Sequence, residues 1–207
     1  LFIKKLYIRN NTLENFNLKI KNIYKNKNNK IFFLHNLAPH SPYEFNSDCS
    51  KRKNYIDHVS SHYNDKMYSV AQQKKLYLEN IKCVNKYLKE VINNIFDFDK
   101  DPLILLTSDH GSRIGNNHLI EKYDKNFNYN KKIDKNLFGS FFNISSAIYL
   151  PNKCRKYYKK NISVVNETRI LLSCLYDKKI ESVEDNFYLV VENKKLIKLN
   201  GMNLINY

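Results

Sequence analysis

Two short apolar runs on either side of a long amphipathic segment constrain the fold of this chain more than any other feature. Ile31–Leu34 and Leu103–Thr107 are largely apolar stretches of strand length, which is typical of strands buried on both faces. Between them, from about residue 65, apolar residues recur at three- and four-residue steps and predict an amphipathic helix of many turns. A helix between two buried strands is characteristic of an α/β unit, so we expect an α/β fold with a parallel sheet.

The second half of the chain continues this alternation of strands and helices. Ile144–Leu150 has strand character and is followed by a proline. Asn166–Leu175 predicts a short helix, with Asn166 as its cap. Phe187–Val191 and Lys195–Leu199 predict a terminal hairpin. By contrast, residues 1–30 are polar and rich in Asn and Lys, and we expect a weak helix or loop there.

The charge of the chain suggests nucleic acid at first, because 35 Lys and Arg outnumber 20 Asp and Glu and give a net charge of +15. Most of these basic residues are lysines interspersed with asparagine, a bias typical of AT-rich coding sequence, so we favour a solvated basic surface over a nucleic-acid site. Hydrophobic residues make up 43% of the 207 residues, which is enough to bury a core, so we do not expect a wholly disordered chain. No apolar run is long enough to span a membrane.

The four cysteines, Cys49, Cys83, Cys154 and Cys174, are widely spaced and show no zinc-binding pattern. Four free thiols are the default expectation for a packed domain. Two disulfides remain open if the chain faces an oxidising compartment, and the spacing does not choose among the three pairings.

The second apolar run leads directly into Asp109, His110 and Gly111. Ligands of α/β sheets gather at the carboxyl ends of strands, and a carboxylate beside an imidazole suits a divalent metal such as zinc or manganese. The alternative is that Asp109 caps a following helix and that His110 is an ordinary loop residue.

The first apolar run leads into a second histidine-bearing loop with His35 and His40. Pro39 and Pro42 restrict the backbone there and favour fixed placement of the imidazoles, which can then contact an oxyanion. A structural proline turn is the alternative. Because two strand ends each deliver histidine, we expect a shared site.

Four motifs then carry a resemblance to a known family. HNLAPHSPYEF, PLILLTSDHGSR, FNISSAIYLP and ISVVNETRILLSCLYDKKIESVEDNFY follow one another as in the sulfatase-like branch of the alkaline phosphatase superfamily. The resemblance covers about Ile31 to Tyr188. Members of this branch include sulfatases, phosphoethanolamine transferases and lipoteichoic acid synthases. It implies a mixed, largely parallel sheet flanked by helices and a metal-dependent hydrolase or transferase acting on sulfate or phosphate esters.

Carried over residue by residue, the resemblance implies that Asp109 and His110 are ligands of one divalent metal ion, which could be zinc, manganese or calcium. The other ring nitrogen of His110 is then held by an acceptor that the sequence does not identify. The resemblance likewise implies that His35, His40 and Arg113 contact the substrate.

The chain departs from the family upstream of His35, where relatives carry the nucleophile and the first acidic metal ligand. Nothing in residues 1–30 resembles that region, and Cys49 lacks the proline of a sulfatase nucleophile motif. We therefore expect residues 31–207 to be the C-terminal portion of such a catalytic domain and residues 1–30 to be a polar remnant of the missing part. On this expectation the nucleophile lies upstream, no catalytic residue is present, and the chain alone has negligible turnover and binds metal weakly.

The expected partner is an anionic sulfate or phosphate ester, linked to a glycan or a lipid. The alternative is a noncatalytic domain of the same fold that binds an anionic glycan or a lipid head group. Nucleic acid is not expected, and a membrane is expected only through an upstream anchor. Because many members of the family have their catalytic domain outside the cytoplasm, the resemblance suggests a location on the extracytoplasmic face of a membrane.

Overall fold

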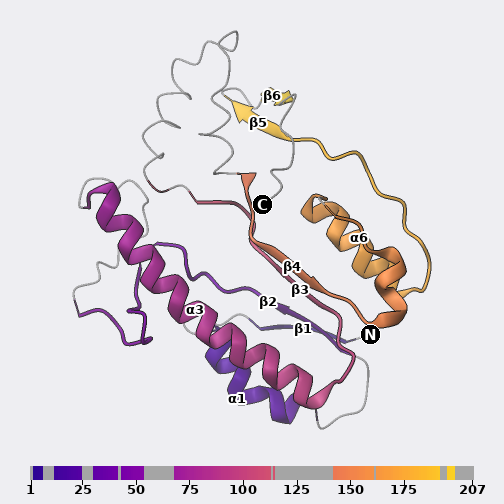
Figure 1. The fold of residues 1–207 in the computed structure, drawn as a ribbon, viewed down its shortest axis with the longest axis horizontal. Helices are drawn as coiled ribbons and strands as arrows, with labels where there is room; N and C mark the ends of the chain where they lie inside the picture. Colours follow the sequence, from indigo (N-terminus) through magenta and orange to yellow (C-terminus); the bar gives the residue numbers. More distant parts are fainter. Residues whose placement is uncertain are drawn as a thin grey trace. The chain divides into compact units, whose positions relative to one another are not determined.

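The computed structural model describes residues 2–6, 12–24, 30–41, 43–53, 68–112, 114, 142–160, 162–191 and 195–198. The chain divides into an N-terminal unit, residues 1–100, and a C-terminal unit, residues 101–207 (Figure 1). Each unit has its own buried apolar cluster, so each can be understood from its own elements.

In the N-terminal unit, the strands β1 (Phe2–Leu6) and β2 (Lys30–Leu34) form a parallel pair. The helix α1 (Thr12–Tyr24) connects them, and it packs against the long helix α3 (Val70–Phe98). Parallel strands require a crossover connection of this kind. The unit is therefore a β–α–β arrangement with a second helix against the first.

The helix α3 confirms the helix predicted between the two apolar runs. It begins with a capping box, in which Ser69 Oγ accepts the Gln72 amide and the Gln72 side chain accepts the Ser69 amide. Although α3 has 29 residues, neither it nor any other described helix is apolar enough over its length to cross a membrane.

Residues 1–30 contain more structure than the sequence predicts. Instead of a weak helix or loop, they contain β1 and a 13-residue helix. Leu13, Phe16 and Ile20 lie on one face of α1 and are buried with Val91 of α3. Each such side chain contributes about 1.5–3 kcal/mol when it is fully buried, so α1 is part of the core of this unit.

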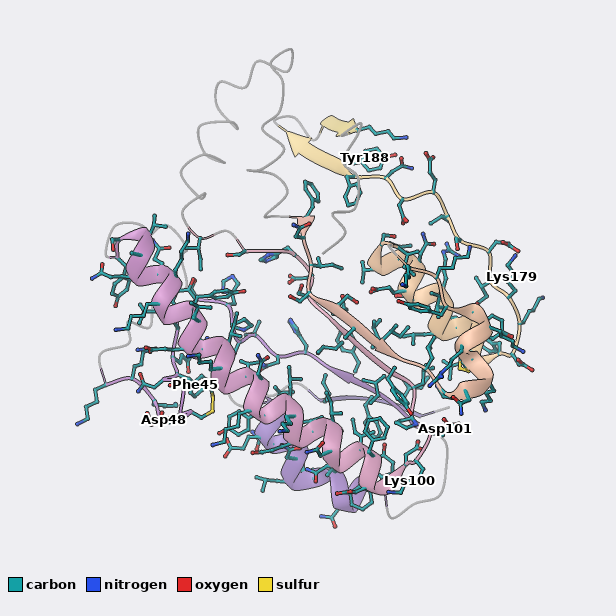
Figure 2. All side chains as sticks on the ribbon, in the orientation of Figure 1. Phe45, Asp48, Lys100, Asp101, Lys179 and Tyr188 are labelled. Carbon is teal, nitrogen blue, oxygen red and sulfur yellow. A yellow bond between two sulfur atoms is a disulfide. The ribbon has the colours of Figure 1, made fainter. Side chains whose placement is uncertain are left out.

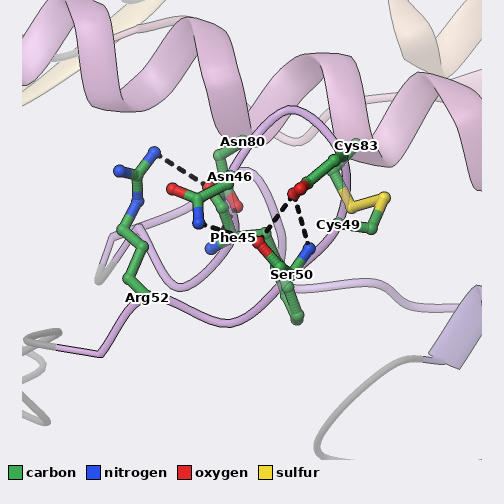
Figure 3. The surroundings of a disulfide bond; sticks show 8 residues. Phe45, Asn46, Cys49, Ser50, Arg52, Asn80 and Cys83 are labelled. Carbon is green, nitrogen blue, oxygen red and sulfur yellow. Dashed lines mark hydrogen bonds between the residues drawn. A yellow bond between two sulfur atoms is a disulfide. The ribbon is translucent and has the colours of Figure 1, made fainter.

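The loop of residues 43–53 lies along α3 and is fixed to it by several contacts (Figure 3). A disulfide joins Cys49 to Cys83 of α3. The buried side chain of Asn80 accepts the Phe45 amide at 3.2 Å. Arg52 pairs with Glu79 of α3 and donates to the Phe45 carbonyl at 3.0 Å.

In the C-terminal unit, β3 (Ile104–Thr107) and β4 (Ser146–Tyr149) form an antiparallel pair. The chain continues into the 3-10 helix η1 (Asn152–Tyr157) and the helix α6 (Val164–Leu175). Leu150, Cys154, Ile170 and Cys174 form the buried cluster. The strands β5 (Tyr188–Val191) and β6 (Lys195–Lys198) form the antiparallel hairpin that the sequence predicts.

The expectation of free cysteines is wrong. Cys154 of η1 is joined to Cys174 of α6, as Cys49 is joined to Cys83, and no cysteine is free. Each bond connects a non-helical or 3-10 segment to a longer helix within one unit. Sequence spacing carries no information on such contacts, because the partners are 34 and 20 residues apart.

The predicted cap of α6 is also wrong, since Ser163 occupies the N-cap position and Asn166 lies inside the first turn. Asn166 is buried and binds the extended segment that follows the helix. Its amide donates to the Val183 carbonyl at 2.9 Å and to Asp185 at 2.8 Å, and its oxygen accepts the Val183 amide at 3.0 Å.

Helices and strands alternate as predicted, but the largely parallel sheet is not confirmed. Of the described strand pairs, β1–β2 is parallel, and β3–β4 and β5–β6 are antiparallel. Since β2 and β3 belong to different units, their place in one parallel sheet stays a prediction. The two strands are not buried on both faces, because Phe33 is 59% exposed and Leu106 is 39% exposed.

Candidate functional site

The end of β3 is held by its pairing with β4. Thr107 is in register with Ser146, and the Ser108 amide donates to the Ser145 carbonyl at 3.0 Å. The Ser145 amide in turn donates to Ser108 Oγ at 2.9 Å. These bonds continue the strand pair by one residue, so Asp109 is the first residue beyond the paired segment.

Asp109 and His110 lie close together at this strand end. The His110 amide donates to Asp109 Oδ1 at 3.0 Å, which fixes the carboxylate beside the backbone. His110 Nε2 lies 3.8 Å from Asp109 Oδ2. The Asp109 side chain is 88% exposed and that of His110 is 33% exposed, so both remain open to solvent.

The second ring nitrogen of His110 determines which nitrogen can bind a ligand. His110 Nδ1 lies 2.7 Å from the Gly111 carbonyl oxygen, which can only accept a hydrogen bond. Nδ1 therefore carries the proton of the neutral imidazole, and Nε2 carries the lone pair in the plane of the ring. The Gly111 carbonyl is the acceptor that the sequence could not identify. In metal-binding histidines, the ring nitrogen that does not bind the metal usually donates its N–H to an acceptor of this kind.

The chemistry of this pair fits a divalent cation. Two atoms bound to one ion at about 2.0–2.4 Å lie within roughly 5 Å of each other, and the 3.8 Å separation of Nε2 and Oδ2 meets this condition. Nitrogen and oxygen ligands together suit zinc or manganese. In the part of the chain that the structure describes, no third His, Cys, Asp or Glu joins the pair as a potential ligand.

Arg113, the third residue after His110 and a predicted substrate contact, lies outside the described residues. The loop is described again at Ile114, whose amide donates to Ser112 Oγ at 3.3 Å. The expected role of Arg113 stays a prediction.

The histidines of the other strand end are placed differently. His35 directly follows β2, and His35 and His40 are both exposed. The His40 amide donates to the Leu37 carbonyl at 2.8 Å, and His40 Nδ1 donates to the Ser41 carbonyl. Pro39 follows a cis peptide bond, while Pro42 lies outside the described residues.

The structure therefore brings Asp109 and His110 together within the C-terminal unit, while His35 and His40 belong to the N-terminal unit. A site shared by the two strand ends stays a prediction. In His40, as in His110, Nδ1 is the ring nitrogen that is hydrogen-bonded to the carbonyl of the following residue.

Glu167 is a polar residue near the β3 end whose position in the sequence indicates only the start of a helix. Its Oε1 accepts Ser146 Oγ at 2.6 Å, at the first residue of β4. Its Oε2 is buried and has no hydrogen-bond partner among the described residues. The strand–helix contact that buries this carboxylate joins residues 21 positions apart, so no local pattern predicts it.

Comparison with known proteins identifies one family. The model of the sulfatase family matches residues 6–175 of the chain. The matched range includes the loops that carry His35, His40, Asp109 and His110. The searches of curated proteins and of solved structures returned no match.

Proposed function

Because the chain belongs to the sulfatase family, we propose that it takes part in metal-dependent hydrolysis or transfer of sulfate or phosphate esters, with Asp109 and His110 as metal ligands. Sulfatases act on sulfate esters, so an anionic ester is the expected substrate. The observation that carries the proposal is the convergence of His110 Nε2 and Asp109 Oδ2 at 3.8 Å, with His110 Nδ1 bound to the Gly111 carbonyl.

The residues of the β3 end would each do part of this work. The Gly111 carbonyl holds the proton of His110 on Nδ1, so the lone pair of the neutral imidazole is on Nε2. The His110 amide orients the Asp109 carboxylate and leaves Oδ2 for the cation. A divalent ion bound there would polarise an ester oxygen and stabilise negative charge during the reaction.

The substrate contacts of this proposal come from the other strand end and from Arg113. His35 and His40 would donate ring N–H groups to the ester oxyanion, since exposed imidazoles can reach a ligand in solvent. Arg113 would add a charged donor, which binds sulfate or phosphate oxygens more strongly than a neutral donor does. We assign no nucleophile among residues 1–207.

The two disulfides support a location on the extracytoplasmic side of a membrane. Disulfides form and persist mainly in oxidising compartments, and both pairs join segments within one unit. This part of the proposal also favours a substrate outside the cytoplasm, such as an ester on a glycan or a lipid.

Metal titration of the 207-residue chain tests the ligand assignment without requiring turnover. We would titrate chelator-treated protein with Zn²⁺, Mn²⁺ or Ca²⁺ by calorimetry and compare Asp109→Asn with wild type. Asp97→Asn is the matched control, because Asp97 is an exposed aspartate of α3 in the other unit. Loss of a ligand should weaken binding by more than the roughly 10–100-fold typical of losing an outer hydrogen-bond partner.

Equal affinities for wild type, Asp109→Asn and Asp97→Asn would overturn the assignment. Where an ester is turned over, Asp109→Asn should also lower kcat by orders of magnitude, whereas Asp97→Asn should not. Binding of an anionic glycan without any metal dependence would instead support the alternative, a noncatalytic domain of the sulfatase fold.

A further inference from the structure

A pocket in the C-terminal unit is lined by basic side chains that the proposed metal chemistry does not use. It has a volume of about 220 Å³ and lies between η1, α6 and residues 179–182. The basic side chains that line it are Lys156, Lys159, Arg169 and Lys179, and no acidic residue of the described chain lines it. Figure 2 shows Lys179 on the extended segment that follows α6.

The positive charge of this basic pocket is only partly compensated. Lys156 pairs with Asp177 at 2.8 Å, and Lys179 pairs with Glu181 at 2.9 Å. Lys159 Nζ instead donates to the neutral hydroxyl of Ser182 at 3.0 Å. Four basic side chains with two adjacent carboxylates leave an excess of positive charge around the pocket, which favours an anionic ligand.

Arg169 provides a donor that lacks an acceptor. Its Nε is buried and has no hydrogen-bond partner among the described residues. A buried donor without a partner is unfavourable, and a charged donor gains more from an anionic acceptor than from a neutral one. Arg169 also lines the pocket, so an anion bound there would lie beside this charged side chain.

The walls of the pocket are held in place by contacts inside the unit. The disulfide from Cys154 to Cys174 ties η1 to α6. Ser173 Oγ accepts the Ile180 amide at 2.9 Å, which ties the segment carrying Lys179 to the same helix. Because these elements are already connected, the segments that carry the basic groups are held in place before an anion binds. Binding therefore has a smaller entropic cost.

We propose that this basic pocket binds a single sulfate or phosphate group of a polar ligand, as a site separate from Asp109 and His110. The volume is below the roughly 300–1,000 Å³ of pockets that enclose drug-sized molecules, so it suits one anionic group rather than an entire large substrate. The donors come from three segments of the chain, which matches a tetrahedral oxyanion approached from several directions.

Titration with sodium sulfate and with sodium phosphate tests this proposal, with sodium chloride at equal ionic strength as the blank. Binding is followed by amide shifts in ¹H–¹⁵N spectra of the full chain. We expect saturable shifts at residues 156–159, 169–173 and 179–182. Arg169→Gln should weaken binding by about tenfold and Lys159→Gln by roughly threefold, because a buried charged donor contributes more than an exposed one.

Lys160→Gln is the matched control, since Lys160 is exposed and adjacent to Lys159 but does not line the pocket. It should leave the affinity unchanged, and so should Asp109→Asn, which separates this proposal from the metal site. If Arg169→Gln does not fold, the wild-type shifts and the affinity of Lys159→Gln still show whether the basic pocket binds the anion.

The ratio of the two affinities tells whether the group is sulfate or phosphate, and tighter binding of either anion than of chloride supports the site. An absence of saturable shifts would overturn the proposal. An equal loss of affinity in Lys159→Gln and Lys160→Gln would do the same, because it would mean that the anions respond only to the net charge.

Discussion

The two units use a similar sequence pattern for different local chemistry. In each unit a short strand leads into a loop that carries histidine. In the C-terminal unit, His110 lies beside a carboxylate and has its Nδ1 bound to the backbone, so a nitrogen and an oxygen converge. In the N-terminal unit, His35 and His40 are exposed along a loop that bonds to its own backbone. A histidine-bearing strand end therefore predicts a ligand pair only when a carboxylate is adjacent.

The units are more alike in how they hold a loop against a helix. Each has one disulfide and one buried asparagine on its main helix, Cys83 with Asn80 on α3 and Cys174 with Asn166 on α6. Asn80 makes one hydrogen bond to the loop at residues 43–53, whereas Asn166 makes three to the segment at residues 183–185. The similarity makes the units suitable for matched substitutions.

Removal of the disulfides should have the largest effect on stability. We expect Cys49→Ala with Cys83→Ala, and separately Cys154→Ala with Cys174→Ala, each to lower the free energy of unfolding by roughly 3–4 kcal/mol. The chain-entropy relation predicts a loss about 0.5 kcal/mol larger for the first pair, because the Cys49–Cys83 bond closes a loop of 34 residues rather than 20. Urea unfolding of the two double variants measures this, with reduced wild type as the control. A loss below about 1 kcal/mol in either would contradict it.

The buried asparagines should have the next largest effect. Asn166→Ala leaves several groups of the 183–185 segment without partners and should cost about 2–3 kcal/mol, whereas Asn80→Ala should cost about 1 kcal/mol. Asn85→Ala, at an exposed position of α3, is the control and should change stability by less than about 0.5 kcal/mol. Thermal and urea unfolding measure these differences. A larger cost at Asn80 than at Asn166 would show that the count of hydrogen bonds does not explain how the two units hold their loops.

The smallest effect on stability is expected from one exposed carboxylate in each unit, Asp48 and Asp177. Hydrogen bonds from Ser50 lower the pKa of Asp48, and hydrogen bonds from Lys156 and Tyr157 lower the pKa of Asp177. A carboxyl whose pKa is lower in the folded state stabilises the protein above its unfolded pKa. That contribution is lost as the pH falls through the folded pKa.

Carboxyl NMR titrations should therefore give both groups pKa values below the usual value for aspartate. Ser50→Ala should raise the pKa of Asp48 and leave the pKa of Asp177 unchanged, and Tyr157→Phe should do the reverse. If Ser50→Ala shifted the pKa of both carboxyls, the two groups would not be controlled separately by their own hydrogen-bond donors.

The sequence predicts the regular elements where a periodic pattern is long or an apolar run has clear ends. The repeat through Tyr77, Ile81, Val84 and Leu88 predicts α3, and the apolar run before Pro151 predicts β4. It does not predict β1, because Phe2–Leu6 has two lysines in five residues and its pairing with β2 depends on a contact distant in sequence.

The candidate site follows the same rule. Asp109 and His110 are adjacent in the chain and can be proposed from sequence, and both lie within the range that the family model matches. The Gly111 acceptor requires the ring orientation of His110, which only the three-dimensional structure provides. The basic pocket joins residues from 156 to 182, and Asn166 looks like a helix cap until its contacts with Val183 are known. Contacts made through tertiary packing have no local signature.

The most direct test of the metal-site proposal is the state of the His110 imidazole. Long-range ¹H–¹⁵N spectra of the chain, assigned with His110→Gln, report which ring nitrogen carries the proton and which one binds metal. We predict a proton on Nδ1 without metal and a large shift confined to Nε2 when Zn²⁺ is added, with no such shift in the Asp109→Asn variant at the same concentration. A proton on Nε2, or a zinc-induced shift at Nδ1, would contradict the geometry from which the site is proposed.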